Sequence, residues 1–497
     1  VVQERFEHYN HIGRGVGYEP GEISHLEYAD DISGREYEST ITSLSYINRV
    51  NYAFDDRYLL TVNFRNDRSS LFPEDNNSGS YFSVSGAWKI HNEAFINLPE
   101  VINTLKLRGG YGQLGNNTIG AYGYTATVNS FANYAFGNML APGTTAITLK
   151  DPNITWEDTE TINAALEIGM FKDKLQFSME YFEKKSTDLL ASVPLPFSTG
   201  SFPASITTNA AAVKNNGFEF AVSYNSYEKE FKYNISANLG TLNNEVLEIG
   251  LDGNPINGVG SRTEVGRSIG EIYVYEMEGI FQNQAVIDAH ANQPSAAPWD
   301  IKFKDQLTID TDGDGIPDEA DGLITDADRT YQGITIPKYS YGLNFGSSYK
   351  NFDFSFFFQG SGGNKVINGT YHDLMLGDYI NHHTDMLNYW TPNNTDTNVP
   401  RPIIGDPNGN NRLSSRNIES GDYLRLQNIE LGYNIQLNDS KILQKARIYV
   451  TGQNVFTITN YQGYDPDFSS DGLFSRGFDL GSFPNPRGIM FGVDVLF

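Results

Sequence analysis

The chain has 497 residues, of which 13% are aromatic (30 Tyr, 31 Phe and 4 Trp), with 48 Gly, no Cys and a formal net charge of −26. Without cysteine it forms neither disulfides nor thiolate metal sites, and its acidity disfavours nucleic acid as a partner. No apolar run approaches the roughly 18 residues that a membrane-spanning helix needs, which excludes a helical membrane protein. Residues 1–5 lack a basic and apolar leader, so we expect that the numbering begins inside a longer chain or that the start has been removed.

Residues 1–39 are polar and show little periodicity. Alternating apolar side chains, the pattern of a strand with one apolar face, then predict four strands, at residues 41–54, 58–66, 81–89 and 105–114. A tight turn at Asp55, Asp56 and Arg57 joins the first two. A long segment rich in Gly, Asn and Thr, residues 115–155, follows the fourth.

Three hairpins with one apolar and one polar face are predicted next, at residues 166–181, 218–239 and 339–359. The second follows a looser stretch, residues 191–212, and a polar excursion, roughly residues 243–337, separates it from the third. One face of the third hairpin carries a row of aromatic side chains, Phe352, Phe354, Phe356 and Phe358. Such ribbons occur in soluble sheets, where the apolar face is buried, and in membrane barrels, where it meets lipid.

The C-terminal part holds three more predicted strands, after a loop at residues 361–420 that is rich in Asn, Asp, Pro and Gly. The apolar phase of the strand at residues 423–435 slips halfway, which predicts a β-bulge near Gln427. A strand at residues 447–456 follows, and the last strand, residues 489–497, ends on an aromatic residue. That ending is typical of bacterial outer-membrane barrels.

Tight turns alternate with long polar loops along the whole chain. The turns lie at Asp55, Lys172, Glu228 and Lys350. Outer-membrane barrels show this asymmetry, with short periplasmic turns and long extracellular loops. The predicted fold class is therefore all-β, a transmembrane antiparallel β-barrel with about 14 strands in this chain. The charged residues opposite the apolar faces are expected to face the polar lumen: Glu167, Glu180, Glu219 and Asp353.

Ordered motifs along most of the chain resemble those of a known family. They include Asn48-Arg49-Val50-Asn51-Tyr52, Lys214-Asn215-Asn216-Gly217-Phe218-Glu219, Tyr423-Leu424-Arg425-Leu426, Gly452-Gln453-Asn454 and Gly463-Tyr464-Asp465-Pro466. The second of these resembles a turn of that family. On these motifs the chain resembles the C-terminal part of a SusC/RagA-type TonB-linked outer-membrane transporter of Bacteroidetes.

The resemblance implies a complete protein with an N-terminal plug and a barrel of about 22 strands. Residues 1–497 would then be its C-terminal barrel portion, without the plug and the earliest strands. The implied function is import of a nutrient, an oligosaccharide or a peptide, and not catalysis. The implied partners are a SusD-like surface lipoprotein, a TonB complex reached through the N-terminal part, and outer-membrane lipid. The lumen residues would line the substrate path or hydrogen-bond to the plug.

Three alternatives stay open on the sequence alone. The first is a calcium-stabilised extracellular adhesin or glycan-binding β-protein, which would be soluble and monomeric without detergent. The second is a barrel with a structural role in an envelope assembly, and substrate found between its loops and a lipoprotein would argue against that role. The third is a barrel of about 14 strands that closes on itself.

An acidic segment within residues 300–330 has the spacing of a calcium loop. Carboxylates occupy loop positions 1, 3, 5, 9 and 12, with glycine at position 6: Asp310, Asp312, Asp314, Asp318, Asp321 and Gly315. Ile316 would offer its carbonyl at position 7. The tail at residues 322–329 resembles that of a compact acidic loop of the same family, and this resemblance implies that the last ligand is either Asp321 or Asp328. We expect a divalent cation, Ca²⁺, in a structural role, because neutralised carboxylates let a long surface loop fold. A solvated acidic turn is the alternative.

Two weaker signals lie in the loops. A set of histidines and aspartates fits no known metal or catalytic spacing, and we expect them to be ordinary surface or plug-contact residues: His372, His382, His383, Asp373 and Asp385. Several loop aromatics could stack on a glycan or peptide, or pack the loops on each other or on the partner lipoprotein: Phe197, Phe202, Tyr371, Tyr379, Tyr389 and Trp390. Of these two roles, packing is favoured.

Overall fold

In the computed structural model of the chain, the structure describes residues 6–16, 31–121, 123–126, 128–129, 132–146, 148–250, 253–377, 381–436, 444–468 and 474–496. The chain divides into two compact units. Unit 1 comprises residues 1–88, 108–163 and 184–212, and unit 2 comprises residues 89–107, 164–183 and 213–497.

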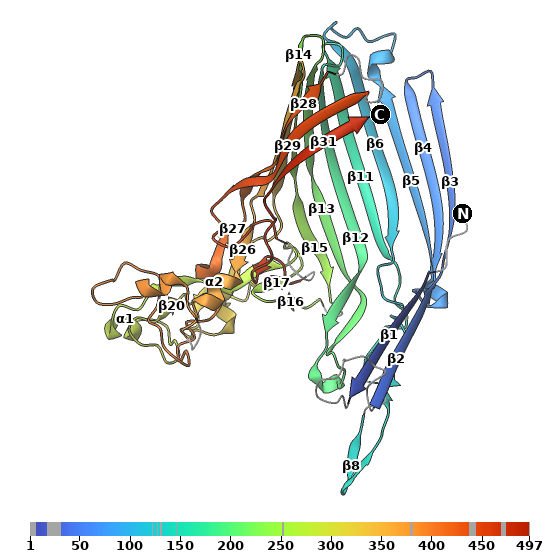
Figure 1. The fold of residues 1–497 in the computed structure, drawn as a ribbon. Coiled ribbons are helices and arrows are strands. Elements are labelled where there is room, and N and C mark those ends of the chain that lie inside the picture. Colours follow the sequence, from blue (N-terminus) through green and yellow to red (C-terminus); the bar gives the residue numbers. More distant parts are fainter. Residues whose placement is uncertain are drawn as a thin grey trace. The chain divides into compact units, whose positions relative to one another are not determined.

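Within the described residues, one sheet contains fourteen strands, as the alternation predicts (Figure 1). In order of pairing, thirteen of them are β3 (Ser43–Phe54), β4 (Tyr58–Ser69), β5 (Ser78–Lys89), β6 (Ile102–Asn116), β11 (Glu157–Met170), β12 (Leu175–Pro194), β13 (Ser205–Ser226), β14 (Phe231–Thr241), β24 (Tyr339–Tyr349), β25 (Phe352–Gly362), β28 (Tyr423–Ile435), β29 (Lys445–Thr459) and β31 (Gly488–Leu496). The fourteenth, β15 (Asn243–Ile249), pairs with β13 beside this path. Each long strand pairs with the next long strand of the sequence, which is the topology of an up-and-down barrel.

Short elements fill the long polar segments of unit 2. A four-stranded sheet consists of β16 (Ile256–Asn257), β17 (Ser261–Thr263), β18 (Glu271–Tyr275) and β23 (Arg329–Gly333). Two strand pairs are β19 (Met277–Ile280) with β20 (Ile301–Phe303) and β21 (Leu307–Ile309) with β22 (Glu319–Ala320). A three-stranded sheet consists of β27 (Ile418–Ser420), β26 (Lys365–Asn368) and β30 (Phe478–Asp479). The helices α1 (Gln284–Asp288) and α2 (Gly369–Leu374) lie in the same segments. In the part of the chain that the structure describes, every helix is too short to cross a membrane.

Further short elements lie in unit 1 and in the connections. Three two-stranded sheets belong to unit 1: β1 (Phe6–Val16) with β2 (Asp31–Ile41), β7 (Val128–Asn129) with β10 (Thr145–Ala146), and β8 (Tyr134–Phe136) with β9 (Met139–Ala141). The connections contain 3₁₀ helices η2 (Glu74–Asn76), η3 (Ile90–Asn92), η4 (Phe197–Thr199), η5 (Asp326–Asp328), η6 (Thr384–Asn388) and η7 (Ser415–Asn417).

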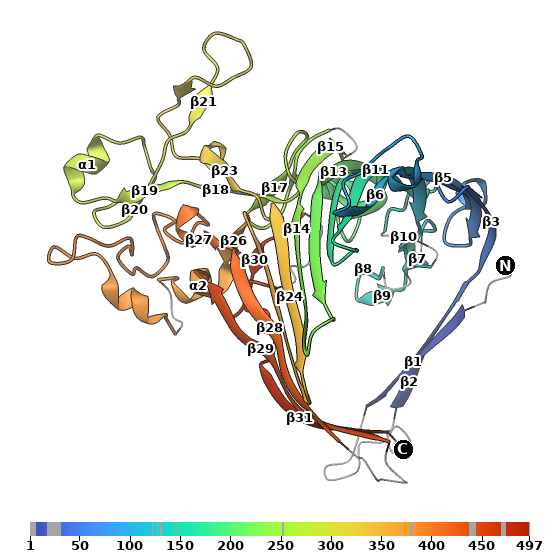
Figure 2. The ribbon, with the colours of Figure 1, turned by 90° about the horizontal axis from the view of Figure 1, so that it is seen from above.

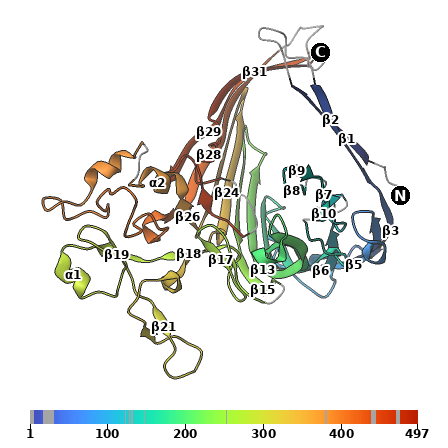
Figure 3. The same cartoon turned by 90° about the horizontal axis from the view of Figure 1, so that it is seen from below.

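The strands β24, β25, β28, β29 and β31 of unit 2 carry an exposed apolar face. Their registers align one row of partners across four strands, Phe352, Tyr433, Ile448 and Val493. These four side chains are between 36% and 66% exposed. Figure 3 shows β24, β28 and β29 running side by side. An ordered apolar surface of this kind is unsuited to water and suits the hydrocarbon of a membrane.

The predicted bulge is confirmed at Gln427. Leu426 and Asn428 pair with adjacent residues of β25, so Gln427 between them has no partner there. Across β29 the same two residues pair with residues that are not adjacent, and Asn454 within that interval has a φ of +48°. A bulge re-aims the side chains beside it. The bulge at Gln427 lies two residues from Arg425, the centre of a buried polar cluster.

The two long segments of unit 2, residues 243–337 and 361–420, pack against each other. Asp300 is fully buried and accepts hydrogen bonds from Nε and Nη2 of Arg401, at 2.7 and 3.0 Å. Beside this pair the rings of Trp299 and Trp390 stack with centroids 5.4 Å apart. The loops therefore form a folded layer with its own core, of which Ile301 and Phe303 are fully buried members.

Unit 1 has a separate aromatic core. Phe72 and Trp156 are buried with ring centroids 5.1 Å apart, and Tyr81 of β5 packs against Trp156 at 6.2 Å. Leu71 and Ile154 complete the buried cluster. Both Phe72 and Trp156 come from connections and not from strands, so the loops of this unit are also folded onto the sheet.

Several expectations for local structure are wrong. The polar residues 1–39 contain the hairpin β1–β2, because backbone pairing between strands does not require apolar side chains. The looser stretch at residues 191–212 is mostly strand, since β12 ends at Pro194 and β13 begins at Ser205. Residues 214–219 lie inside β13 and form no turn. The expected end of the last strand, Phe497, lies outside the described residues.

Candidate functional site

The acidic segment connects β21 and β22, and Figure 2 shows it projecting away from β18 and β23. The carboxylate of Asp310 accepts hydrogen bonds from the backbone amides of Gly313 (2.7 Å) and Gly315 (2.8 Å). Both glycines have positive φ, +76° and +88°, so the tight turn depends on the lack of a side chain there. The oxygens of Asp310, Asp312 and Asp314 lie within 4.8 Å of one another, a spacing at which one cation can bridge them.

The other four residues predicted for this site make different contacts. Both oxygens of Asp318 accept from the Thr311 hydroxyl, and Asp321 accepts from the amide of Leu323 at 2.8 Å. Ile316 donates its amide to Asp314. The structure thus brings together three of the seven residues, all exposed.

Asp328 is the clearest departure from the predicted set. It is fully buried, and its oxygens accept from the amides of Gln306 (2.9 Å) and Thr325 (2.6 Å). Thr325 and Asp328 form a capping box for η5. The carboxylate of Asp328 is therefore a helix cap and not a cation ligand, because the backbone amides of Gln306 and Thr325 already bind it.

Hydrogen bonding separates the pKa values of the carboxylates in this segment. The amides of Gly315 and Gly313 hold the pKa of Asp310 below its usual value. The Thr311 hydroxyl and amide do the same for the pKa of Asp318. Burial raises the pKa of Asp305, and the nearby charges of Asp328 and Asp321 add to this rise.

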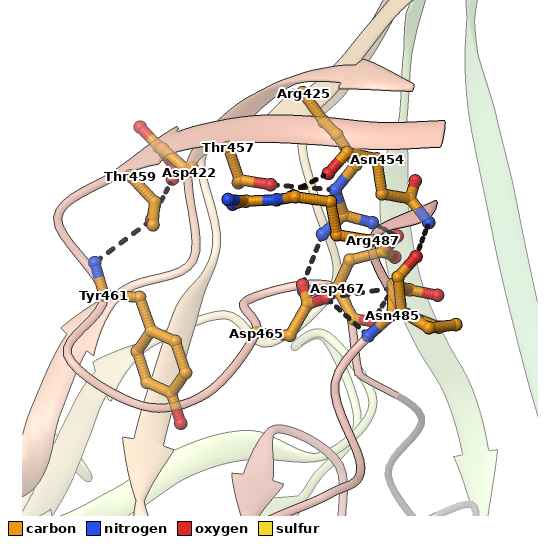
Figure 4. Close-up of polar contacts among 11 residues, drawn as sticks. Asp422, Arg425, Asn454, Thr457, Thr459, Tyr461, Asp465, Asp467, Asn485 and Arg487 are labelled. Atoms are coloured by element: carbon orange, nitrogen blue, oxygen red, sulfur yellow. Dashed lines mark hydrogen bonds and ion pairs between the residues drawn. The ribbon is translucent and has the colours of Figure 1, made fainter. Parts of the chain in front are cut away.

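A second site surrounds Arg425 of β28, which is 2% exposed (Figure 4). Its Nε donates to the hydroxyl of Thr457 (3.0 Å), its Nη1 donates to Asp467 (3.0 Å), and its Nη2 donates to Asp465. Asp465 in turn accepts at 3.0 Å from both the amide and the side chain of Asn485. Arg425 therefore fixes two loop segments, residues 461–467 and 484–487, onto the strands β28 and β29.

A polar cleft of about 420 Å³ opens beside this cluster. Its lining consists of Arg425, Asn454, Thr457, Thr459, Gly463, Tyr464, Asp465, Pro466, Pro484, Asn485 and Arg487. At its rim, Nε of Arg487 donates to the carbonyl of Asn454 at 3.4 Å, and Asn454 donates its side-chain amide to the carbonyl of Pro486 at 3.0 Å.

A smaller, more apolar cleft of about 210 Å³ adjoins the first and shares Gly463 and Tyr464 with it. The rest of its lining is Asn368, Thr370, Tyr371, Leu374, His383 and Gln462. The rings of Tyr371 and His383 meet edge to face at 5.2 Å. Tyr464 thus lines both clefts, and it is 70% exposed.

The face of the sheet opposite the apolar rows carries ion pairs. Arg447 of β29 donates to Asp353 of β25 through Nε (3.1 Å) and also binds Glu430 of β28. Of the other predicted lumen residues, Glu167 pairs with Lys106 at 3.0 Å and Glu219 is exposed. The expectation that Asp353 shares the polar face is confirmed. That Arg447 is its partner was not predicted.

The weaker candidates are also placed. Among the described residues the histidines near position 380 form no group close enough to bind a metal; His372 bonds to Asp373 (2.9 Å). Trp390 is buried, which confirms a packing role, and Tyr371 packs against a buried cluster. Phe197 and Phe202 are 90% and 76% exposed, so they do not pack into a loop core, and packing on a partner stays a prediction for these two. Tyr379 lies outside the described residues.

A comparison with protein families decides the affiliation. The model of the family described as TonB dependent receptor-like, beta-barrel, matches residues 6–265. The chain belongs to this family. As a TonB-dependent receptor-like β-barrel, it is a protein of the outer membrane, as predicted.

Several relatives of this TonB-dependent receptor barrel cover nearly all of it. TonB-dependent receptor P3 of Formosa agariphila is 32% identical over 91% of this chain and 45% of its own length. TonB-dependent receptor SusC of Bacteroides thetaiotaomicron is 29% identical over 100% of this chain and 48% of its own length. A solved chain of the RagAB peptide transporter has the same fold, with a TM-score of 0.82 and 23% identity over 99% of this chain and 52% of its own. The chain spans about half the length of these relatives.

Proposed function

We propose that the chain is the C-terminal barrel portion of an outer-membrane importer, which takes up an oligosaccharide or a peptide with energy from a TonB complex. The observation that carries this proposal is the two-faced sheet within a receptor family. The exposed apolar row that contains Phe352 and Val493 is a surface for contact with lipid. The ion pair of Arg447 with Asp353 on the other face is typical of the wall of a polar conduit. Catalysis has no place in the proposal, since the relatives are receptors and transporters.

The proposed partner on the outer side is a SusD-like surface lipoprotein. Two similarities support it, to the receptor SusC and to the RagAB peptide transporter. The folded layer held together by Asp300 and Arg401 offers a preformed surface for such a partner. A preformed surface binds with less ordering cost than flexible loops.

Purification from the native outer membrane tests the proposed import function and the proposed lipoprotein partner. The full-length protein, carrying an affinity tag, is extracted in mild detergent, and the co-purified proteins and small molecules are identified by mass spectrometry. We expect one surface lipoprotein in stoichiometric amount and a bound oligosaccharide or peptide. Recovery of envelope-assembly proteins, with neither lipoprotein nor ligand, would contradict the proposal and favour a structural role.

We further propose that Asp310, Asp312 and Asp314 hold a structural Ca²⁺. Oxygen ligands are what this hard cation takes, and three carboxylates already converge without it. Bound there, the cation would neutralise repulsion in the turn at Gly313 and Gly315. The described residues therefore fit the ion, with three converging protein ligands in place of the larger set that the sequence pattern predicts.

Calorimetric titration of the full-length protein with Ca²⁺ after chelation tests this site. We expect saturable binding that Asp312→Asn abolishes. The matched control is Asp288→Asn, which alters an exposed aspartate in α1 outside the group. Absence of binding heat, or equal binding by the Asp312 variant, would leave the segment a solvated acidic turn.

A further inference from the structure

We propose that the two clefts flanking Tyr464 are one binding groove for an oligosaccharide, with a sugar unit on each side of the Tyr464 ring. This deepens the proposed import function and rests on it. The groove lies entirely within unit 2, among described residues. Four features of the groove support the proposal: the way Tyr464 is held, the cancelled charges of the larger cleft, the chemistry of the smaller cleft, and the kind of groups that line both.

The ring of Tyr464 is exposed but its backbone is anchored on both sides. On one side Tyr461 is buried and its hydroxyl bonds to Asp479, which is 1% exposed. Gly463 lies against the Tyr461 ring, where an added Cβ would come within 2.4 Å of ring atoms. On the other side Asp465 bonds to buried Arg425. The ring of Tyr464 is therefore held in position and open to a ligand.

The charges of the larger cleft are mostly cancelled within it. Arg425 is neutralised by Asp465 and Asp467, and all three of its nitrogen groups have partners. The amide groups of Asn454 and Asn485 donate to the protein, and among the described residues their side-chain oxygens accept no hydrogen bond. The cleft therefore offers neutral acceptors beside an aromatic ring, which suits hydroxyl groups better than ions.

The smaller cleft repeats this chemistry. Tyr371 and His383 form an aromatic wall, and Gln462 lies in the lining. Asn368 also lines the cleft, but its buried amide accepts from the Tyr371 amide and donates to Glu419, so it shapes the cleft and offers no free group. The hydroxyl of Thr370 is buried and has no hydrogen-bond partner among the described residues. A buried hydroxyl without a partner is costly, so a ligand hydroxyl or a water molecule is expected to bind it.

The kind of groups in the groove favours a sugar over a peptide. A peptide bound by strand addition pairs its main chain with a free strand edge, whereas side chains of amides, hydroxyls and aromatics line these clefts. Aromatic rings pack against the apolar C–H face of a pyranose while amides and hydroxyls bond its rim. Arg487, at the rim of the larger cleft and paired with no carboxylate among the described residues, adds donors for sugar hydroxyls or for a uronic acid.

An array of oligosaccharides tests the groove with the purified full-length protein. The probes are neutral and uronic-acid oligosaccharides of plant, algal and animal origin, with a panel of random decapeptides beside them. We expect binding to at least one class of oligosaccharide, weakened at least about tenfold by Tyr464→Ala and largely kept by Tyr464→Trp. Phe483→Ala is the matched control, because Phe483 is 90% exposed but lines neither cleft.

The outcomes separate this inference from the import function. Binding of decapeptides alone, or oligosaccharide binding that Tyr464→Ala leaves unchanged, overturns the groove while import stands. Absence of binding to every oligosaccharide on the array overturns the groove as well. Only loss of TonB-dependent uptake of both substrate classes would overturn the import function. The variant Arg487→Gln tests the rim of the larger cleft. If it loses binding only to the uronic-acid oligosaccharides, Arg487 binds their carboxylate.

Discussion

Arg425 in the barrel wall and Asp465 in a loop, forty residues further along the chain, form a buried ion pair. Their contact ties the segment that carries Tyr464 to β28. Because Asp465 also accepts two hydrogen bonds from Asn485, a single carboxylate orders both segments beside the larger cleft. The geometry of the proposed groove thus depends on residues that a ligand need not touch.

Removal of Arg425 should loosen the groove more than the barrel. Arg425→Ala leaves Asp465 buried without its cation, and loss of one partner of a buried ion pair costs about 3–5 kcal/mol. We expect the free energy of local opening of residues 461–467 to fall by about that amount, measured by amide hydrogen exchange of the full-length protein. Exchange in β24 and β25 should stay the same.

The control for that experiment is Arg487→Ala, which removes an exposed guanidinium from the same cleft. It should leave exchange of residues 461–467 close to that of the wild type. Arg425→Lys should resemble Arg425→Ala, because a lysine lacks the planar fork that reaches Asp465, Asp467 and Thr457 together. Unchanged exchange in both Arg425 variants would mean that the loop orders itself without the ion pair.

Gly463→Ala should disturb the same segment by a steric route. The new methyl group would come within 2.4 Å of the buried Tyr461 ring, and overpacking of this kind costs about 1–3 kcal/mol. We expect faster proteolytic cleavage near residue 463 in the intact barrel. Gly120→Ala, where a Cβ would meet no atom within 4 Å, serves as the control. Equal cleavage rates for the two variants would be inconsistent with the close approach.

Acid should release the turn between β21 and β22. The pKa values of Asp310 and Asp318 are lowered by hydrogen bonds in the folded turn, from the amides of Gly315 and Gly313 and from Thr311. A lowered pKa contributes stability above the unfolded value, about 3.9 for Asp, and that stability is lost as the pH falls through the folded value. In chelator, we expect cleavage of this turn by pepsin to stay low near pH 5 and to rise below about pH 3.9.

Thr311→Val removes the hydroxyl that Asp318 accepts from and thus isolates one of these bonds. The variant should be cleaved faster at pH 5 and should show a weaker rise on acidification. Cleavage that is independent of pH in both proteins would show that the carboxylates contribute nothing to the order of the turn.

A charge introduced on the apolar face should lower the free energy of unfolding more than the same charge on the polar face. Val493 in β31 is 66% exposed on the apolar row, and an arginine near the middle of a membrane costs about 2–4 kcal/mol. We expect Val493→Arg to lower the free energy of unfolding in lipid vesicles by about that amount. Asn344→Arg, on the opposite face of β24, should change it little. The reverse order would mean that the faces are assigned the wrong way round.

Local pattern was sufficient for most of the long strands and not for the site. The alternation of β25 and the phase slip at Gln427 are properties of consecutive residues, so the sequence predicts both the aromatic row and the bulge. The partners of Arg425 and of Arg447 come from far along the chain, and nothing in the neighbouring residues specifies them. For the same reason the groove beside Tyr464 was not predicted.

The acidic segment shows a second limit of pattern. Asp310, Asp312 and Asp314 converge because their spacing follows the tight turn that Gly313 and Gly315 permit. Asp328 was the alternative last ligand by resemblance to the family's loop, yet it caps η5 and is fully buried. Only the competing hydrogen-bond donors, which the fold supplies, decide between these two uses of a carboxylate.

Energised uptake is the decisive measurement. Cells that lack the full-length gene, cells that carry it, and cells that carry it with a blocked TonB complex are given a fluorescent form of the substrate recovered with the purified protein. We predict accumulation in the periplasm only of cells with both the gene and a working TonB complex. Equal accumulation in all three strains would contradict import by this barrel.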